Sequence, residues 1–372
     1  TAFLAARARR RLKAVLLLSA SGYGVALLFA THGAPDLALT QVMVETVTLL
    51  LFVLVLRRLP TYFTNRPFSR DRWLRVAIAT GTGIVVAIAG AVAAMSRVAV
   101  PVSERFPDAT LEFGYGRNIV NVTLVDTRAW DTMGEISVLL VAATGVASLL
   151  FLRDRAGMVD AARNRLRPGV STKVWDDGSD ALDRKLRGSE HERPSANVRA
   201  PLRDRPWLAA GKTLSPRRRS LVFEVATRLM FHSMLVFSLY FLFAGHNQPG
   251  GGFAGGLMAG AALIVRYLAA GRYELGEAVR ISAGQLLGGG LIIALTAGIL
   301  PVAFGGSVLQ TVVFDFQLPV YGDVHLASAL LFDIGVYVLV LGLVLDVLRS
   351  LGAEIDRHGE LEGISDEDSD DS

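Results

Sequence analysis

Eight long apolar runs constrain the fold of this 372-residue sequence more than any other feature. A helix needs about 20 mostly apolar residues to cross a bilayer, with a range of roughly 17–25. The runs predict spans at residues 14–30, 36–56, 74–95, 135–152, 221–243, 251–270, 283–303 and 325–348. With 52% apolar and only 19% charged residues, such a chain cannot bury its apolar surface in a water-soluble core. The sequence therefore predicts an all-α membrane protein with about eight transmembrane helices.

The positions of Lys and Arg predict how the spans are oriented. With the N-terminus inside, the inner connections and ends hold 33 of the 38 basic residues, and the outer connections hold 4. Cytoplasmic segments of membrane proteins carry such an excess. We therefore expect a multi-pass protein of the cell membrane whose two termini and long loop are cytoplasmic. Because Thr1 stands where an initiator Met is expected, we expect the chain to have an internal or processed start.

A long basic segment divides the chain into two predicted four-helix halves. Residues 1–152 and 219–350 each hold four spans, and residues 153–218 form a cytoplasmic linker. The linker region lacks the interleaved aromatic residues typical of nucleic-acid binding, so contact with anionic lipid or with partner subunits is favoured over nucleic acid. Residues 351–372 are strongly acidic and are predicted to be a disordered tail.

The residue types also exclude several kinds of chemistry. The sequence has no cysteine, which rules out disulfides, thiolate zinc sites, iron–sulfur clusters and cysteine nucleophiles. It shows no nucleotide-binding motif, no Ser/His/Asp constellation and no metal-ligand spacing. We therefore expect no cofactor, no metal centre and no enzymatic activity.

Polar residues inside the second predicted span are candidates for an ion path, because a charge at mid-bilayer is costly. Glu45 lies nine residues beyond Asp36, so it is about 14 Å into a hydrocarbon layer of roughly 30 Å. Gln41 and Thr48 lie about one turn to either side of Glu45. Asp36 follows Pro35 in the first helical turn, where a carboxylate also has an ordinary helix-start role. For Glu45, the alternative is a structural carboxylate neutralised by a neighbouring helix.

Two later spans carry further ionisable groups. Glu224, Arg228 and His232 recur every four residues, so they are predicted to share one helix face. An unperturbed histidine titrates near neutral pH, and the three residues form either a proton relay or a Glu–Arg pair that only neutralises itself. Asp333 lies about nine residues into the last span, again near mid-depth.

The connection between the fifth and sixth spans is rich in glycine. Its notable residues are His246, Pro249, Gly250, Gly251, Gly252, Phe253, Gly256 and Gly260. Gly252, Gly256 and Gly260 recur every four residues and give a flat face for close helix packing. Pro249 and the glycines also permit a half-unwound helix entry, which is tolerated at membrane depth only where it is buried or lines water. Packing against partners is favoured, backbone carbonyls lining an ion route are the alternative, and His246 is expected to be structural.

Four strings in the sequence carry a family resemblance. Residues 33–41 with Val44-Glu45-Thr46, and positions within 121–135, resemble the C-terminal region of the large A-type component of Mrp-type multisubunit Na⁺/H⁺ antiporters. Residues 245–256 and 330–337 resemble the B-type component of the same family. Together the matching regions cover nearly all the spans, but neither the basic linker nor the acidic tail.

The resemblance implies a fusion of these two components that lacks the N-terminal, proton-channel-like module of the A-type one. A mid-helix lysine and a Glu–Lys pair mark that module, and neither is visible here, so the resemblance does not imply that this chain pumps protons alone. The family expels Na⁺, or sometimes K⁺ or Li⁺, in exchange for inward protons. By this match, Glu45 is the first choice for a translocation carboxylate and Asp36 lies at the mouth of the path.

Three functions remain open on the sequence. The leading one is an antiporter subunit that contributes buried carboxylates to the Na⁺ path and docks the other membrane subunits. The second is a scaffold subunit without an ion path of its own. The third is a membrane-arm subunit of a related hydrogenase or complex I-like assembly. The expected partners are other membrane subunits and the lipid bilayer, without nucleic acid; a dimer of the whole complex is left open.

Overall fold

The structure is a computed structural model that is mostly helical. It describes residues 1–56, 59, 62–63, 69–96, 98–161, 221–279, 281–318 and 322–370. Its elements are α1 (Ala2–Arg7), α2 (Arg11–Thr31), α3 (Pro35–Leu56), α4 (Ser69–Met95), η1 (Val102–Arg105), α5 (Phe106–Glu112), α6 (Ile119–Val122), η2 (Thr123–Thr127), α7 (Ala129–Ala161), α9 (Leu221–Ala244), α10 (Gly252–Ala278), α11 (Ala283–Ala303), β1 (Val313–Leu318), β2 (Gly322–Ala327) and α12 (Ala329–Asp370). From residue 162 onward, the predicted linker at 153–218 lies outside the described residues.

Seven of the described helices are long and apolar enough to cross a membrane. They are α2, α3, α4, α9, α10, α11 and α12. Helix α7 contains the predicted span 135–152 and is not among these seven. The fold is therefore that of a helical membrane protein with seven candidate spans, and the eighth span stays a prediction.

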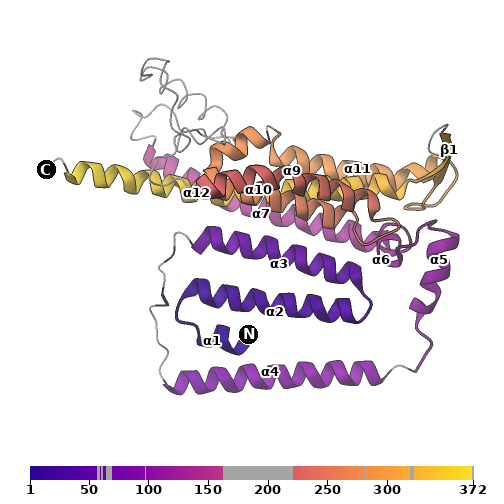
Figure 1. Cartoon of the computed structure of the whole chain (residues 1–372), viewed down its shortest axis with the longest axis horizontal. Coiled ribbons are helices and arrows are strands. Elements are labelled where there is room, and N and C mark those ends of the chain that lie inside the picture. Colours follow the sequence, from indigo (N-terminus) through magenta and orange to yellow (C-terminus); the bar gives the residue numbers. More distant parts are fainter. Residues whose placement is uncertain are drawn as a thin grey trace, which may run out of the picture.

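Helix α10 lies at the centre of the packed bundle. Helices α9, α12 and α3 pack against it, and α11 and α7 pack against α12 (Figure 1). The predicted glycine face of α10 meets α12 of the same chain: Gly256 lies against Val340, and Gly260 lies against Val344. A Cβ atom at either glycine would overlap these valines, so the absence of side chains lets the two helices approach closely.

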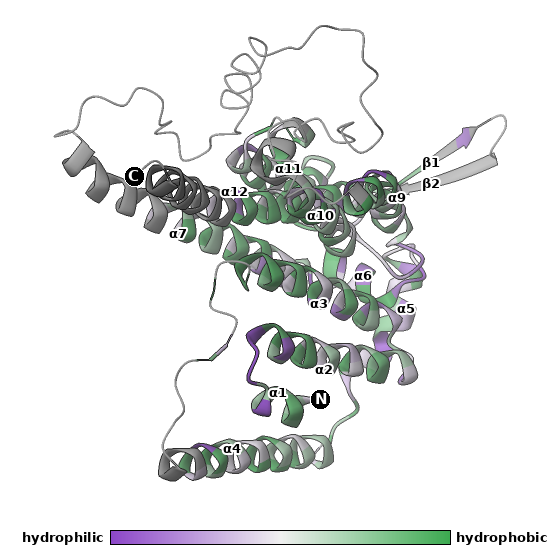
Figure 2. Cartoon of the chain, turned by 60° about the vertical axis from the view of Figure 1, so that its left-hand side comes forward, coloured by the Kyte–Doolittle hydropathy of each residue, from purple (hydrophilic) through white to green (hydrophobic). Residues whose placement is uncertain are grey.

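The first four predicted spans do not form a bundle of their own, contrary to the prediction of two four-helix halves. Helices α2 and α3 form an antiparallel pair, with a hydrogen bond of 2.8 Å between the hydroxyls of Tyr23 and Thr46. Helix α4 stands apart, and its side chains from residue 73 onward are exposed (Figures 1 and 2). Hydropathy predicts that a helix lies in lipid but does not predict which helix it packs against, so the sequence could not reveal this arrangement.

A β-hairpin precedes the last helix. Strand β1 pairs antiparallel with β2, with Val313 opposite Ala327. The sequence predicted a span from residue 325, but residues 325–327 belong to β2 and α12 begins at Ala329. A short apolar run does not distinguish a strand from a helix, which explains the error. Asp333 therefore lies in the second turn of α12, close to the helix start rather than nine residues into it.

Helix α12 continues as far as Asp370, into the segment 351–372 that the sequence predicted to be disordered. The residues from 351 to 370 contain no proline, and nothing in them stops a helix at a defined point. Here the structure differs from the sequence-based expectation.

Loops and short elements gather at one end of the bundle, which we call the hairpin end. It holds α5, α6, η2, the β-hairpin and the connection between α9 and α10 (Figure 1). The candidate functional site lies at this end.

Candidate functional site

The connection between α9 and α10, residues 245–251, forms a tight loop that we call the glycine loop. The backbone N–H groups of Gly245 and Gly251 both donate to the carbonyl of Phe241, at 3.1 and 2.8 Å. Gly251 has a φ of +99°, a backbone conformation that other L-residues rarely adopt. The loop therefore folds back on the end of α9, and α10 starts abruptly at Gly252.

Two carboxylates from different parts of the chain bind this loop. Oδ1 of Asp36, in the first turn of α3, accepts a hydrogen bond of 3.0 Å from the Gly250 N–H. Oδ1 of Asp333, on α12, accepts one of 3.0 Å from the Gly252 N–H. Both residues are buried, with 8% and 5% of their surface exposed. The N–H groups at the start of α10 favour negative charge, so the start of this helix suits the Asp333 carboxylate.

Two asparagines complete the arrangement. Asn118 donates from Nδ2 to Asp36 Oδ1 at 3.1 Å and to the carbonyls of Gly245 and Gln248 at 2.8 and 2.9 Å. Its Oδ1 caps the first turn of α6. Asn121, one turn later, donates from Nδ2 to Asp333 Oδ2 at 3.0 Å.

We call Asp36, Asn118, Asn121, Asp333 and residues 245–252 the glycine-loop clamp. Each carboxylate in it receives one backbone N–H and one asparagine N–H. Among the described residues, neither carboxylate forms an ion pair with a basic side chain. A buried carboxylate held only by neutral donors has the capacity to take up a proton or a cation, because either one removes the unbalanced charge.

Glu45, the first sequence candidate, lies outside this clamp. Its half-buried side chain packs against Gly22 of α2, where a Cβ atom would collide with the carboxylate. Gly22 therefore makes room for Glu45 between α2 and α3. Gln41 and Thr48, on the neighbouring turns, are also half-buried.

The structure separates the three residues of the predicted relay in α9. Glu224 is 1% exposed, whereas Arg228 and His232 are far less buried. Nδ1 of His232 lies 3.2 Å from the carbonyl of Arg228 in its own helix. Residues four apart on a helix of 3.6 residues per turn rotate by about 40° at each step, so Glu224 and His232 face directions about 80° apart. Spacing alone overstated how well these residues share a face.

Sequence reasoning singled out Asp36 and Asp333 but missed the residues that connect them. Asn121 occurred only within a family string, and Asn118 was not singled out at all. The available signal was local: an asparagine is among the preferred residues at a helix N-cap. Nothing in the sequence showed that the same side chain also reaches α3 and the glycine loop.

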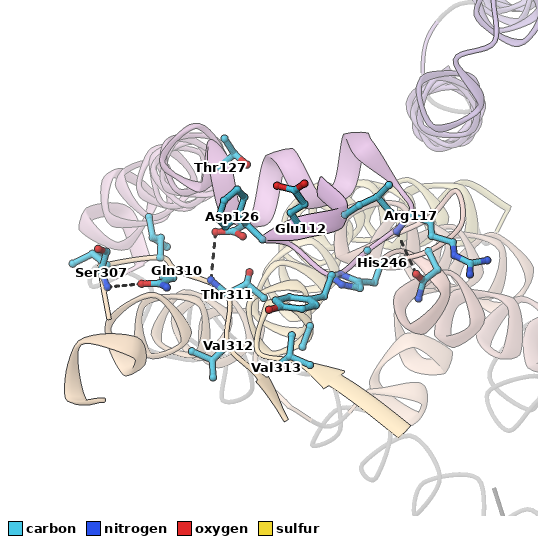
Figure 3. Close-up of a pocket in the computed structure, with 18 of the residues that line it drawn as sticks. Glu112, Arg117, Asp126, Thr127, His246, Ser307, Gln310, Thr311, Val312 and Val313 are labelled. Atoms are coloured by element: carbon cyan, nitrogen blue, oxygen red, sulfur yellow. Dashed lines mark hydrogen bonds between the residues drawn. The ribbon is translucent and has the colours of Figure 1, made fainter. Parts of the chain in front are cut away.

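A cleft of about 1450 Å³ lies beside the clamp at the hairpin end. One wall comes from α5, η2 and the segment between them, and the other comes from residues 307–313. His246, Asn247 and Gln248 of the glycine loop complete the lining (Figure 3). Asp126 is half-buried in this cleft, and its Oδ1 accepts a hydrogen bond of 3.4 Å from the Thr311 N–H.

Burial shifts the pKa values of two groups in the cleft. It raises the pKa of Asp126 above its usual value, although hydrogen bonds from Thr311 and the nearby His246 oppose this shift. It lowers the pKa of His246, although the backbone of Gly114 and Tyr115 and the charge of Asp126 act in the opposite direction. Both groups therefore favour their neutral forms more than they would in water.

Family models match three stretches of the chain. A domain related to the MnhB subunit of Na⁺/H⁺ antiporter matches residues 222–346. The MbhD and MbhE models, which describe two subunits of MBH, match residues 1–61 and 68–164. The matched stretches include all the predicted spans apart from a few end residues.

Curated relatives and a solved structure resemble larger parts of the chain. It is 32% identical to the probable K⁺/H⁺ antiporter A/B fusion subunit of Rhizobium meliloti (strain 1021), over 92% of this chain and 32% of the relative. It is 33% identical to the B-type Na⁺/H⁺ antiporter subunit of Bacillus subtilis (strain 168), over 37% of this chain and 96% of that relative. A chain in the structure of the Mrp complex from Dietzia sp. DQ12-45-1b matches with 33% identity and a TM-score of 0.66, over 94% of this chain and 33% of that chain. The sequence thus spans about a third of the length of the A/B fusion relative.

Proposed function

Because the chain belongs to the Mrp-type Na⁺/H⁺ antiporter family, as the C-terminal region of the A-type component fused to the B-type component, we propose that it contributes carboxylates to the cation path of such a complex. The observation that carries the proposal is the convergence of buried Asp36 and Asp333 on one unwound helix entry. Many secondary transporters bind ions and substrates at such breaks, where helix ends and free backbone groups meet.

The proposed path continues from the clamp along α3. Glu45 lies nine residues beyond Asp36, which places it about 14 Å further along the helix. Its carboxylate makes no hydrogen bond to another described residue, and this supports a role in passing a cation or a proton onward. We therefore keep Glu45, Gln41 and Thr48 in the proposed path and leave out the Glu224–His232 relay, because the separation of its residues favours no continuous internal route.

We propose a secondary active transporter subunit that uses no cofactor and moves an alkali cation against protons. The names of the relatives differ in the cation, K⁺ for one and Na⁺ for another. Two family models carry MBH names, yet a relative named as an antiporter subunit matches over 92% of the chain, so the antiporter is favoured over a hydrogenase arm.

We further propose that the chain lies in the cell membrane with the hairpin end outside and both termini and the linker in the cytoplasm. The distribution of Lys and Arg supports this orientation. The exposed helix α4 supports a docking role, because its apolar side chains need lipid or other membrane subunits around them.

The test is cation-dependent dissipation of ΔpH in everted vesicles that carry the complete complex. Asp36→Asn and Asp333→Asn keep the size and a hydrogen-bond acceptor but remove the charge. Each should lower exchange by about tenfold or more while the complex still assembles. Glu45→Gln should do the same. Asp131→Asn is the matched control, because Asp131 is an exposed acid that pairs with Arg128 on the surface.

The amounts of assembled complex must be matched by co-purification of the other subunits. Wild-type exchange in both clamp variants would show that these carboxylates are structural. The scaffold function would then replace the present proposal.

A further inference from the structure

The cleft at the hairpin end adjoins the clamp through shared residues. His246, Asn247 and Gln248 line the cleft. The Asn118 N–H donates to the His246 carbonyl at 3.2 Å, and Asn118 Nδ2 donates to the Gln248 carbonyl at 2.9 Å. The same Nδ2 atom binds Asp36. One segment of backbone and one asparagine side chain therefore connect the open cleft with the buried carboxylate.

The charges in the cleft are arranged unevenly. Figure 3 shows Glu112 between Asp126 and His246, with Arg117 beyond His246 at the far side. The region around Asp126 and Glu112 therefore carries negative charge without a basic side chain between them. Clefts lined by one sign of charge raise the local concentration of the opposite ion.

Oxygen atoms dominate the same region. Thr127, Ser307 and Gln310 line the cleft near Asp126, and Gln310 Oε1 accepts a hydrogen bond of 2.8 Å from the Ser307 N–H. Carboxylate, hydroxyl and carbonyl oxygens are the ligands that hard cations prefer. A volume of about 1450 Å³ also leaves room for a cation with its water shell.

We propose that this cleft is a vestibule that binds hydrated alkali cations, with Asp126 as its main anionic group, and that it exchanges them with the clamp along residues 246–248. The binding stands on the cleft alone, whereas the exchange with the clamp rests on the proposed function. The vestibule opens on the side of the membrane that carries the hairpin.

Protons compete with cations in this vestibule. Burial raises the pKa of Asp126, so outside acidification discharges it at a higher pH than it discharges an exposed aspartate. The other ionisable groups that line the cleft are Glu112, Tyr115, Arg117 and His246. Low outside pH therefore weakens cation binding, and this effect belongs to the vestibule.

The absence of cysteine makes a labelling test clean for this chain. Thr127→Cys places a thiol at an exposed position in the cleft, next to Asp126. Ser103→Cys places one at an exposed position in η1 outside the cleft. The complete complex in right-side-out vesicles is treated with membrane-impermeant methanethiosulfonate reagents, one cationic and one anionic. The complex without an added cysteine in this chain gives the background.

We expect the cationic reagent to react about fivefold faster than the anionic one at position 127 but not at position 103, as one nearby unit charge predicts. NaCl and KCl should slow the reaction at 127 more than choline chloride of equal strength. Asp126→Asn should abolish both effects. If Asp126→Asn does not assemble, Glu112→Gln on the exposed surface of α5 should still reduce the preference for the cationic reagent.

Equal rates for the two reagents at 127, or equal slowing by NaCl, KCl and choline chloride, would overturn the vestibule. Labelling does not depend on turnover, so its outcome is separate from that of the transport assay. Loss of cation protection with intact effects of Asp36→Asn would refute the vestibule alone. Wild-type transport in Asp36→Asn with protection at 127 would refute the proposed path alone.

Discussion

Helices α4 and α10 are both 27 residues long, apolar and rich in glycine, yet they are packed in opposite ways. In the apolar stretch of α10, 72% of the residues are buried, and in that of α4 none are. The glycines of α10 meet backbone and valine side chains of α12, whereas Gly81, Gly83 and Gly90 of α4 have nothing within 4 Å. Glycine thus permits close packing, but the partner helix decides whether it happens.

The largest expected effect comes from placing the same bulky side chain in both helices. At Gly256 of α10, a Cβ atom would lie 2.8 Å from Val340 Cβ, so Gly256→Leu should destabilise the protein by about 3 kcal/mol or more. Gly83→Leu on α4 should leave the stability of this chain unchanged. The thermal stability of the detergent-purified chain measures both. Similar losses in the two variants would contradict the contrast between the helices.

A smaller loss should follow when the clamp that holds the start of α10 is cut. Asn118→Ala leaves the carbonyls of Gly245 and Gln248 without their donor and removes one donor from Asp36. Unpaired buried groups of this kind cost about 1–3 kcal/mol, which a thermal unfolding series should detect. Asn247→Ala is the matched control, because this exposed amide accepts a single bond of 3.3 Å from the Arg117 N–H. A stability equal to wild type in Asn118→Ala would show that the loop holds without the asparagine.

Acidification should act on the loop before α10 and not on α4. The pKa of His246 lies below its ordinary value of 6.5 because of burial, so the unfolded chain binds a proton more readily than the folded one. Stability should therefore fall as pH drops through 6.5 toward the lowered pKa. His246→Gln should remove this component, as seen in melting temperatures measured across pH. A wild-type slope in His246→Gln would assign the pH dependence to other groups.

The smallest effect should be a gain on α4. Gly83→Ala has open space around its Cβ and replaces glycine with a better helix former, so it should stabilise α4 by about 0.5–1 kcal/mol. Hydrogen exchange of the α4 amides measures this local change. Loss of complex assembly in Gly83→Ala, with the isolated chain intact, would show that another membrane protein of the complex packs on this glycine.

Periodicity and hydropathy predicted most of the helices because a bilayer leaves few alternatives to a long apolar helix. They failed where the apolar run was short. The residues before Ala329 form strand β2, and Asp333 consequently lies nearer to the start of its helix than the sequence predicted. The position of α4 was also beyond reach, because packing partners are set by tertiary contacts that hydropathy does not contain.

The candidate site was predictable only in part, for a related reason. Asp36 and Asp333 stood out because acids within apolar runs are unusual. Asn118 did not stand out, because a polar residue in a connecting segment is ordinary until its contacts are known. The clamp depends on contacts between residues 82 and more than 200 positions apart, and a single sequence carries no direct signal for such pairs.

The two carboxylate hydrogen bonds of the glycine loop also have a mechanical consequence. Gly250 and Gly252 are two residues apart, and they are tied to α3 and α12 respectively. A rigid displacement of α3 relative to α12 must stretch the short segment between them or break one bond. Any motion that preserves both bonds carries α3, α10 and α12 as one block, with α2, α9 and α11 packed on it. Among the seven candidate spans, α4 alone is left outside this block, free to follow whatever lies beside it.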